Sequence, residues 1–120
     1  MDNSDAKWDA QLRKGTLEMV ILAALAPSPR YGLELLNYLH RFETMVITEG
    51  TLYPLLERLK REALISAKWQ QNEGPRPRKY YAITAAGQTR LLQMAERWRQ
   101  SVSDIEQLIP AHIITGREQG

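Results

Sequence analysis

The clearest chemistry in this sequence belongs to its bases, which gather in one stretch and suit the binding of phosphate. Residues 57–81 contain seven Lys or Arg against three Asp or Glu, whereas residues 1–56 contain five against seven and residues 82–120 four against four. A focused basic patch attracts the phosphate backbone of nucleic acid. Its sharpest part is GPRPRKYYAIT, residues 74–84. Taken alone, this segment also fits a solvated loop or a polyproline ligand for another protein.

No group of residues in the sequence has the composition of a catalytic or metal site. The chain has no cysteine, and its two histidines, His40 and His112, lie far apart with no carboxylates at metal-ligand spacing. It also lacks a nucleophile–base pair, paired catalytic carboxylates and a glycine-rich phosphate loop. We therefore expect a protein that is not an enzyme and that uses no cofactor or metal.

Length and composition indicate one globular domain. The chain has 120 residues, of which 43% are hydrophobic and 25% are charged. The N-terminal MDNSDAKWDA is too acidic and polar for a signal peptide, and the longest apolar run, around MVILAALA, is too short to span a membrane. Together with the absence of cysteine, these features predict a cytoplasmic protein without a membrane partner.

Three amphipathic helices are expected before the hairpin. Apolar residues recur at helical spacing over residues 9–25 and again over residues 31–42, and the prolines of APSPR separate the two. A third helix is expected to begin after Thr48, a good N-cap residue. The apolar face of this third helix, which we expect to be buried, consists of Leu52, Leu55, Leu56, Leu59 and Ala63. Its other sides are mostly basic, so this helix presents charge to a partner.

A β-hairpin is expected to follow the third helix. Apolar and polar residues alternate in LISAKWQ, QNEGPRP has the composition of a turn, and RKYYAIT is typical of a returning strand. Trp69 is in phase with Ile65, and Tyr81 is in phase with Ile83, so both aromatic residues are expected to be structural. The tip between the strands is basic and stiffened by its prolines.

The last element is expected to be a long helix that starts at the N-cap Thr84 and ends at Pro110. Its apolar residues recur at steps of three and four, which is the spacing of a coiled-coil seam. The seam consists of Leu91, Ala95, Trp98, Val102, Ile105 and Ile109. A seam of this length favours a two-fold partner, and the alternative is that the helix folds back onto the chain's own core.

The order of these elements is that of a winged helix-turn-helix, mostly α with a small β-hairpin, followed by a long C-terminal helix. In that fold the third helix enters the major groove of double-stranded DNA and the hairpin, or wing, touches the flanking backbone. We expect residues 1–84 to form the DNA-binding domain, residues 85–110 a dimerisation helix and residues 111–120 a flexible tail. A homodimer would set two recognition helices about one DNA turn apart and match a palindromic operator.

Four segments make the sequence similar to the PadR family of bacterial transcriptional regulators. They are KGTLEMVILAAL, YGLELL, TEGTLYPLLERLKREALI and GPRPRKYYAITAAG. The short remainder resembles the subclass with a single C-terminal dimerisation helix. The resemblance implies a homodimeric winged-helix protein, usually a repressor, that a phenolic acid or a planar hydrophobic drug releases from DNA. Two positions depart from the pattern: Ala63 replaces a glycine at the end of the recognition helix, and YGLEL replaces YGYEI.

The residues expected to contact DNA lie in the third helix and in the wing. The wing candidates for phosphate are Arg76, Arg78, Lys79 and Tyr80. The helix candidates, which lie off the leucine stripe, are Thr51, Tyr53, Arg58 and Arg61. Arg58 and Arg61 have the alternative of pairing with Glu57 or Glu62 on the helix surface.

Trp98 lies in the middle of the seam, where it is either a packing anchor of the dimer or a ligand residue. In the subclass that the sequence resembles, a tryptophan at the matching place stacks on flat ligands between protomers, and the ERW of MAERWRQ carries this role over to Trp98. Met94 and Ala95 would suit an adaptable pocket, and Trp8 is a further ligand candidate. The expected function is therefore a ligand-responsive, DNA-binding repressor. The alternative is a winged-helix protein-interaction module without DNA binding.

Overall fold

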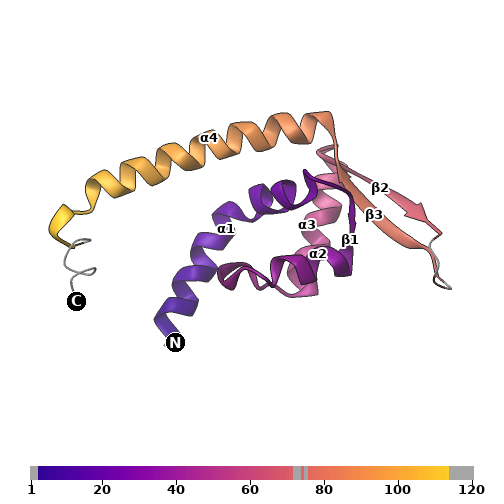
Figure 1. Cartoon of the computed structure of the whole chain (residues 1–120), viewed down its shortest axis with the longest axis horizontal. Helices are drawn as coiled ribbons and strands as arrows, with labels where there is room; N and C mark the ends of the chain where they lie inside the picture. Colours follow the sequence, from indigo (N-terminus) through magenta and orange to yellow (C-terminus); the bar gives the residue numbers. More distant parts are fainter. Residues whose placement is uncertain (1–2, 72–73, 75, 114–120) are drawn as a thin grey trace.

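The structure, a computed structural model, describes residues 3–71, 74 and 76–113. In chain order the elements are α1 (Asn3–Leu25), β1 (Arg30–Tyr31), α2 (Gly32–Leu39), the 3₁₀ helix η1 (Glu43–Met45), α3 (Glu49–Arg61), β2 (Ile65–Gln70), β3 (Arg78–Ile83) and α4 (Ala85–Leu108). Figure 1 shows three helices beside a small sheet, with a long final helix along one edge. This is a winged helix with an added C-terminal helix, so the expected fold class is confirmed. Among the described helices, none is long and apolar enough to cross a membrane.

The core lies where the apolar faces of α1, α2 and α3 meet the base of the sheet. Residues three and four apart share one face of a helix, and here these faces carry leucine and isoleucine. The largest fully buried side chains are Ile21, Leu22, Leu25, Leu35, Leu39, Leu52, Leu56, Leu59 and Ile65. Tyr81 adds to this core from β3 with only 3% of its surface exposed, which confirms its expected structural role.

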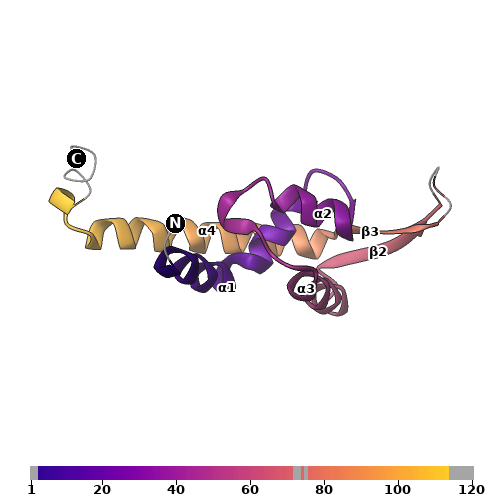
Figure 2. The same cartoon turned by 90° about the horizontal axis from the view of Figure 1, so that it is seen from below.

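The sheet has three antiparallel strands in the order β1-β3-β2, one strand more than the sequence predicts. The additional strand β1 has two residues, Arg30 and Tyr31, which pair with Tyr81 and Tyr80. Two residues are too few to show the alternation that identifies a strand in a sequence. The hairpin of β2 and β3 projects beyond the helices in both views (Figures 1 and 2).

The first two helices differ in length from the sequence prediction. α1 begins at Asn3, earlier than expected, and α2 is shorter than residues 31–42. Tyr31 is taken up by β1, and its backbone N–H donates to Glu34 Oε1 at 3.3 Å to start α2. After α2 the chain turns through η1, and His40 Nε2 lies 3.1 Å from the carbonyl oxygen of Ile47. His40 is therefore a structural residue.

The end of α3 is formed by a non-glycine residue in the left-handed conformation. Ala63 has φ of 61°, a region that glycine enters at far lower cost. Its N–H donates to the carbonyl of Lys60 and the N–H of Leu64 to that of Leu59, both at 3.0 Å. This is the Schellman pattern of a helix C-terminus. The departure at Ala63 thus leaves the backbone geometry of a glycine cap in place.

α4 is held against the sheet by a tight contact at its first turn. Thr84 caps the helix, as expected, by accepting from the N–H of Gly87 at 3.0 Å, and its hydroxyl donates to the carbonyl of Ala63 at 2.7 Å. A Cβ on Gly87 would overlap the carbonyl oxygen of Leu64. Glycine is therefore required here for α4 to leave the sheet at this angle.

Beyond this contact α4 runs along α1 and then past it. Leu91 and Met94 pack against the core, whereas Ile105 and Leu108 are 54% and 80% exposed. In both views α4 extends past the N-terminal end of α1 (Figures 1 and 2). The molecule is accordingly elongated, measuring 57 × 32 × 21 Å.

Candidate nucleic-acid interface and ligand groove

The first turn of α3 is exposed and anchored by threonines. Thr48 caps the helix, as expected: its Oγ1 accepts from the N–H of Thr51 at 3.3 Å and lies 3.3 Å from the Thr51 hydroxyl. Both the free N–H groups and the helix dipole make such a turn favourable for a phosphate oxygen. Thr51 is therefore exposed in a helix turn where a phosphate oxygen would be favourable.

Arg58 is bound to two carboxylates of its own chain. Its guanidinium donates to Glu18 Oε1 and to Glu62 Oε2, each at 2.9 Å. The hydrogen bonds to Glu18 and Glu62 raise the pKa of Arg58. The sequence indicates Glu62 as a possible partner of Arg58. No local pattern indicates Glu18, in α1, because it lies 40 residues earlier in the chain. Arg58 therefore braces α3 against α1.

Glu18 also forms an ion pair with a third helix, α4. Its second carboxylate oxygen lies 3.5 Å from Nε of Arg90 in α4, and its side chain is only 17% exposed. The carboxylate accepts a hydrogen bond from Arg58 and forms a longer ion pair with Arg90, so its charge is compensated from both sides. Glu18 thus connects α1, α3 and α4.

Tyr53 and Arg61 complete the expected contacts on α3. Arg61 is exposed and, within the described part of the chain, forms no ion pair. Tyr53 is 38% exposed, and its ring covers Gly32 so closely that a Cβ there would overlap the phenol. The ring of Tyr53 is therefore held against the start of α2, with its outer side open to solvent.

The wing distributes its bases over both faces of the hairpin. The guanidinium of Arg78 lies 4.3 Å from the ring centroid of Tyr31, and this ring meets Tyr80 edge-on at 5.5 Å. Lys79, next in sequence, points to the other face. Arg76 is exposed beside the tip, where residues 72–73 and Pro75 lie outside the described residues. On one face of the wing, Arg78 is thus held against an aromatic ring.

On its other face the wing meets α3 through Glu57. Lys79 Nζ lies 3.3 Å from Glu57 Oε1, and Lys60 Nζ lies 3.3 Å from Glu57 Oε2. The hydrogen bonds from Lys79 and Lys60 lower the pKa of Glu57. Figure 2 shows α3 nearly end-on beside the base of the hairpin. The sequence indicates Glu57 only as a partner of nearby arginines, since nothing local identifies a lysine 22 residues later as its neighbour.

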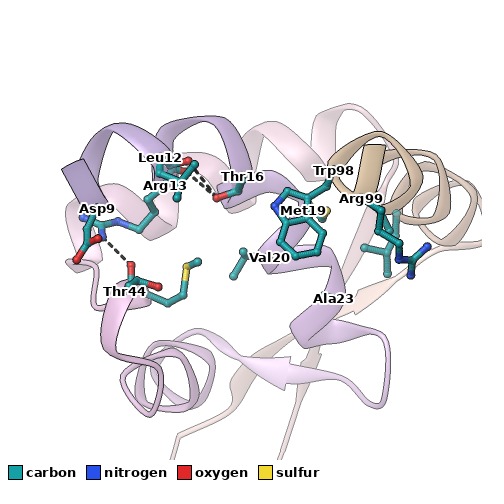
Figure 3. Close-up of a pocket in the computed structure, with 13 residues that line it drawn as sticks. Asp9, Leu12, Arg13, Thr16, Met19, Val20, Ala23, Thr44, Trp98 and Arg99 are labelled. Carbon is teal, nitrogen blue, oxygen red and sulfur yellow. Dashed lines mark hydrogen bonds between the residues drawn. The ribbon is translucent and has the colours of Figure 1, made fainter. Parts of the chain in front are cut away.

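A groove of about 470 Å³ lies between α1 and α4. The indole of Trp98 points into it from α4, towards Met19 and Val20 of α1 (Figure 3). The same α1 face continues through Leu12, Thr16 and Ala23, and η1 adds Met45. The lining is mostly apolar, and its charged residues are Asp9, Arg13 and Arg99. A concave, mostly apolar surface with a few polar groups has the composition of a small-molecule site.

Trp98 also borders a second groove, of about 510 Å³, on its other side. Met94 lines this second groove together with Arg90 and Arg97, whereas Ala95 lines the first. Trp8 is 61% exposed and lines neither of them. Of the three ligand candidates, the structure brings Trp98 and Met94 together and leaves Trp8 apart.

The seam of α4 is only partly covered by the chain itself. Leu91 and Ala95 are half-buried against α1, and Val102 is also half-buried. Trp98 and Ile109 are 48% and 38% exposed, and Ile105 more so. The described chain thus covers the first turns of the seam and leaves the later ones open.

Comparison with known proteins places these features in a family. Residues 21–93 match the model of the transcriptional regulator PadR-like family. The chain is similar to a PadR family transcriptional regulator from Eggerthella lenta, with 33% identity, coverage of 92% of this chain and 96% of that one, and a TM-score of 0.81. A PadR-like transcriptional regulator from Bacillus cereus is 33% identical over 84% of this chain and 98% of its own, with a TM-score of 0.77.

An uncharacterised protein from Lysinibacillus sphaericus is 29% identical over 89 residues, which are 72% of this chain and 82% of that protein. The family match covers α2, α3, both strands of the wing and the start of α4. It therefore includes all the bases of α3 and of the wing described above. The chain belongs to the PadR-like family, whose members are transcriptional regulators rather than enzymes.

Proposed function

We propose that this regulator is a homodimeric repressor that binds a palindromic operator in double-stranded DNA. The observation that carries the proposal is the meeting of α3 and the wing at Glu57, where a lysine from each element reaches the same carboxylate. This contact makes the exposed side of the recognition helix and one face of the wing a single, mostly basic surface. A surface of that kind suits a helix in the major groove with a hairpin on the flanking backbone.

The candidate residues take different roles in this proposal. Arg76, Arg78 and Lys79 bind phosphates from the wing, and Tyr80 supports Arg78 through Tyr31. On α3, Thr51, Tyr53 and Arg61 face the DNA. Arg58 keeps the helix in position through Glu18, since both ends of its guanidinium are occupied.

Binding to DNA from the chain's own upstream region tests the proposal. In a gel-shift series the complex should weaken steeply as salt rises, because bound bases release counterions from the phosphates. Replacing Arg76, Arg78 and Lys79 together by Ala should abolish the shift. Absence of binding to that DNA and to any other duplex at low salt would instead support a protein-interaction module.

The proposed dimer uses the open seam of α4. Trp98, Ile105 and Ile109 remain exposed in one chain, and a second copy would cover them across a two-fold axis. The two wings and the two recognition helices would then be related by the same two-fold symmetry as the two halves of a palindromic operator.

We infer that a planar hydrophobic molecule binds beside Trp98 and releases the repressor. The groove between α1 and α4 is apolar, and it lies next to the seam where two copies would meet. A panel of flat aromatic compounds should quench tryptophan emission saturably in the wild type, and Trp98→Ala should remove this response. An unchanged titration in Trp98→Ala would contradict the role of Trp98, and Trp8→Phe tests whether Trp8 contributes.

A further inference from the structure

The wing carries an exposed tryptophan, Trp69, which the sequence pattern predicts to be structural because it is in phase with Ile65. Its side chain is 64% exposed although it shares a face of β2 with Ile65 and Ala67. Ile65 is buried and Ala67 half-buried, so the core ends before the strand reaches Trp69. A single exposed apolar residue is common on protein surfaces and does not by itself indicate a binding site. Whether Trp69 belongs to a binding surface therefore depends on the residues around it.

The strand register places Trp69 on the side of the hairpin that faces the recognition helix. Trp69 pairs with Lys79, and directly opposite residues of an antiparallel pair project to the same face. Lys79 Nζ lies 5.9 Å from the centroid of the indole and 3.3 Å from Glu57 Oε1 of α3. The indole thus extends, towards the tip, the same surface that Glu57 joins to α3.

The charge around Trp69 identifies the kind of partner. On the face of the hairpin that carries Trp69, the nearest charges are Lys79 and its partner Glu57. The other bases of the two strands, Lys68 and Arg78, project from the opposite face, and Arg76 precedes β3 near the tip. Neither strand contains an acidic residue. A surface of this sign fits a polyanion, and an indole has a flat apolar body for a deoxyribose together with an N–H donor for a phosphate oxygen.

We propose that Trp69 is a DNA-contacting residue of the wing, with its indole lying against the sugar–phosphate backbone beside a phosphate bound by Lys79. The inference rests on the proposed DNA binding and adds to it a neutral, aromatic contact. This contact differs from those of the arginines because it displaces no counterion.

Salt dependence separates the aromatic contact from the ionic ones. The affinity of full-length variants for the labelled upstream duplex would be measured by fluorescence anisotropy at several salt concentrations. Trp69→Ala should weaken binding about tenfold, a loss near the lower end of that for removing an aromatic ring stacked on a base. The slope of log affinity against log salt should stay as in the wild type, whereas Arg76→Ala should lower that slope by about one.

Two further variants sharpen the comparison. Trp69→Phe keeps a ring but loses the N–H donor, so its affinity should lie between those of Trp69→Ala and the wild type. Gln70→Ala alters the next residue, which projects to the opposite face, and should bind as the wild type does. Since Trp69 is exposed, circular dichroism and the melting temperature should be unchanged in Trp69→Ala.

Tryptophan emission gives an independent readout. Saturating DNA should change the emission of the wild type by more than that of Trp69→Ala, because the indole leaves water. Equal affinity and equal emission changes in the two proteins would overturn the role of Trp69 while leaving the proposed function intact.

The role of Trp69 in DNA binding would also be overturned if Trp69→Ala bound DNA normally but changed its oligomeric state in gel filtration. Trp69 would then be a contact between protein chains. Failure of the wild type to bind any duplex would refute both this role and the proposed function.

Discussion

At the scale of single residues, Glu57 holds a negative charge in the middle of the proposed DNA surface. It neutralises Lys79 and Lys60 in the free chain, and it would repel a nearby phosphate. Glu57→Gln should therefore tighten binding to any duplex by several-fold and steepen its salt dependence, because both lysines become available. Anisotropy titrations with the upstream duplex and with an unrelated duplex would measure both effects. Weaker binding to both would show that Glu57 orders the lysines rather than competing with DNA for them.

The backbone conformation of Ala63 leads to a prediction about the stability of the protein. A non-glycine residue in the left-handed region costs about 1 kcal/mol relative to glycine, and here it forms the Schellman end of α3. Ala63→Gly should raise the free energy of unfolding by up to about 1 kcal/mol. Urea denaturation of both proteins at the same protein concentration measures this change in the free energy of unfolding.

The control for this effect is Ala86→Gly, in the first turn of α4, which should lower the stability since its backbone is helical. A loss of stability in Ala63→Gly would mean that the flexibility of glycine in the unfolded chain outweighs the strain removed.

At the scale of elements, the three helices that meet at Glu18 should respond to it together. Glu18→Ala removes the partner of Arg58 and of Arg90, and it should reduce the stability by about 1 kcal/mol since Arg58 is partly screened by solvent. It should also weaken DNA binding, because α3 loses its brace against α1.

A double-mutant cycle of Glu18→Ala with Arg58→Ala isolates this pair. We expect a coupling of about 0.5–1 kcal/mol in urea denaturation. Glu106→Ala, an exposed acidic residue of α4, is the matched control and should change neither stability nor affinity. Additive effects of the two substitutions would show that the contact contributes little to holding α3.

At the scale of the whole molecule, the exposed seam of α4 predicts that DNA affinity depends on dimerisation. Ile105→Glu places a charge in the proposed interface, where burial without a partner is costly. The variant should elute as a monomer in gel filtration with light scattering. Its affinity for the upstream duplex should fall about a hundredfold, because each half-site is then bound independently.

Gln107→Glu adds the same charge on the other side of α4 and should leave the dimer intact. A dimer that persists in Ile105→Glu would move the interface away from the seam. A monomeric Ile105→Glu protein with wild-type affinity would show that one copy suffices for binding.

Much of this architecture follows from local sequence. The helices are recognisable because apolar residues repeat with the period of the helix, and Thr48 and Thr84 act as caps through contacts within four residues. The hairpin follows from alternation, and the basic window identifies the elements expected to meet DNA. These features depend on neighbours in the chain, which is why the sequence alone was sufficient to predict them.

The pairing of the charges was decided by the tertiary structure. Arg58 meets Glu18 across 40 residues and Lys79 meets Glu57 across 22, so two of the residues expected to contact DNA are already paired within the chain. Trp69 has the phase of a core residue, yet it lies beyond the point at which the helices stop covering the sheet. The sequence by itself therefore determined the elements and their charge, since these arise from local periodicity and composition. Only the packed chain decided which side chains are paired and which remain exposed, because both depend on contacts between distant segments.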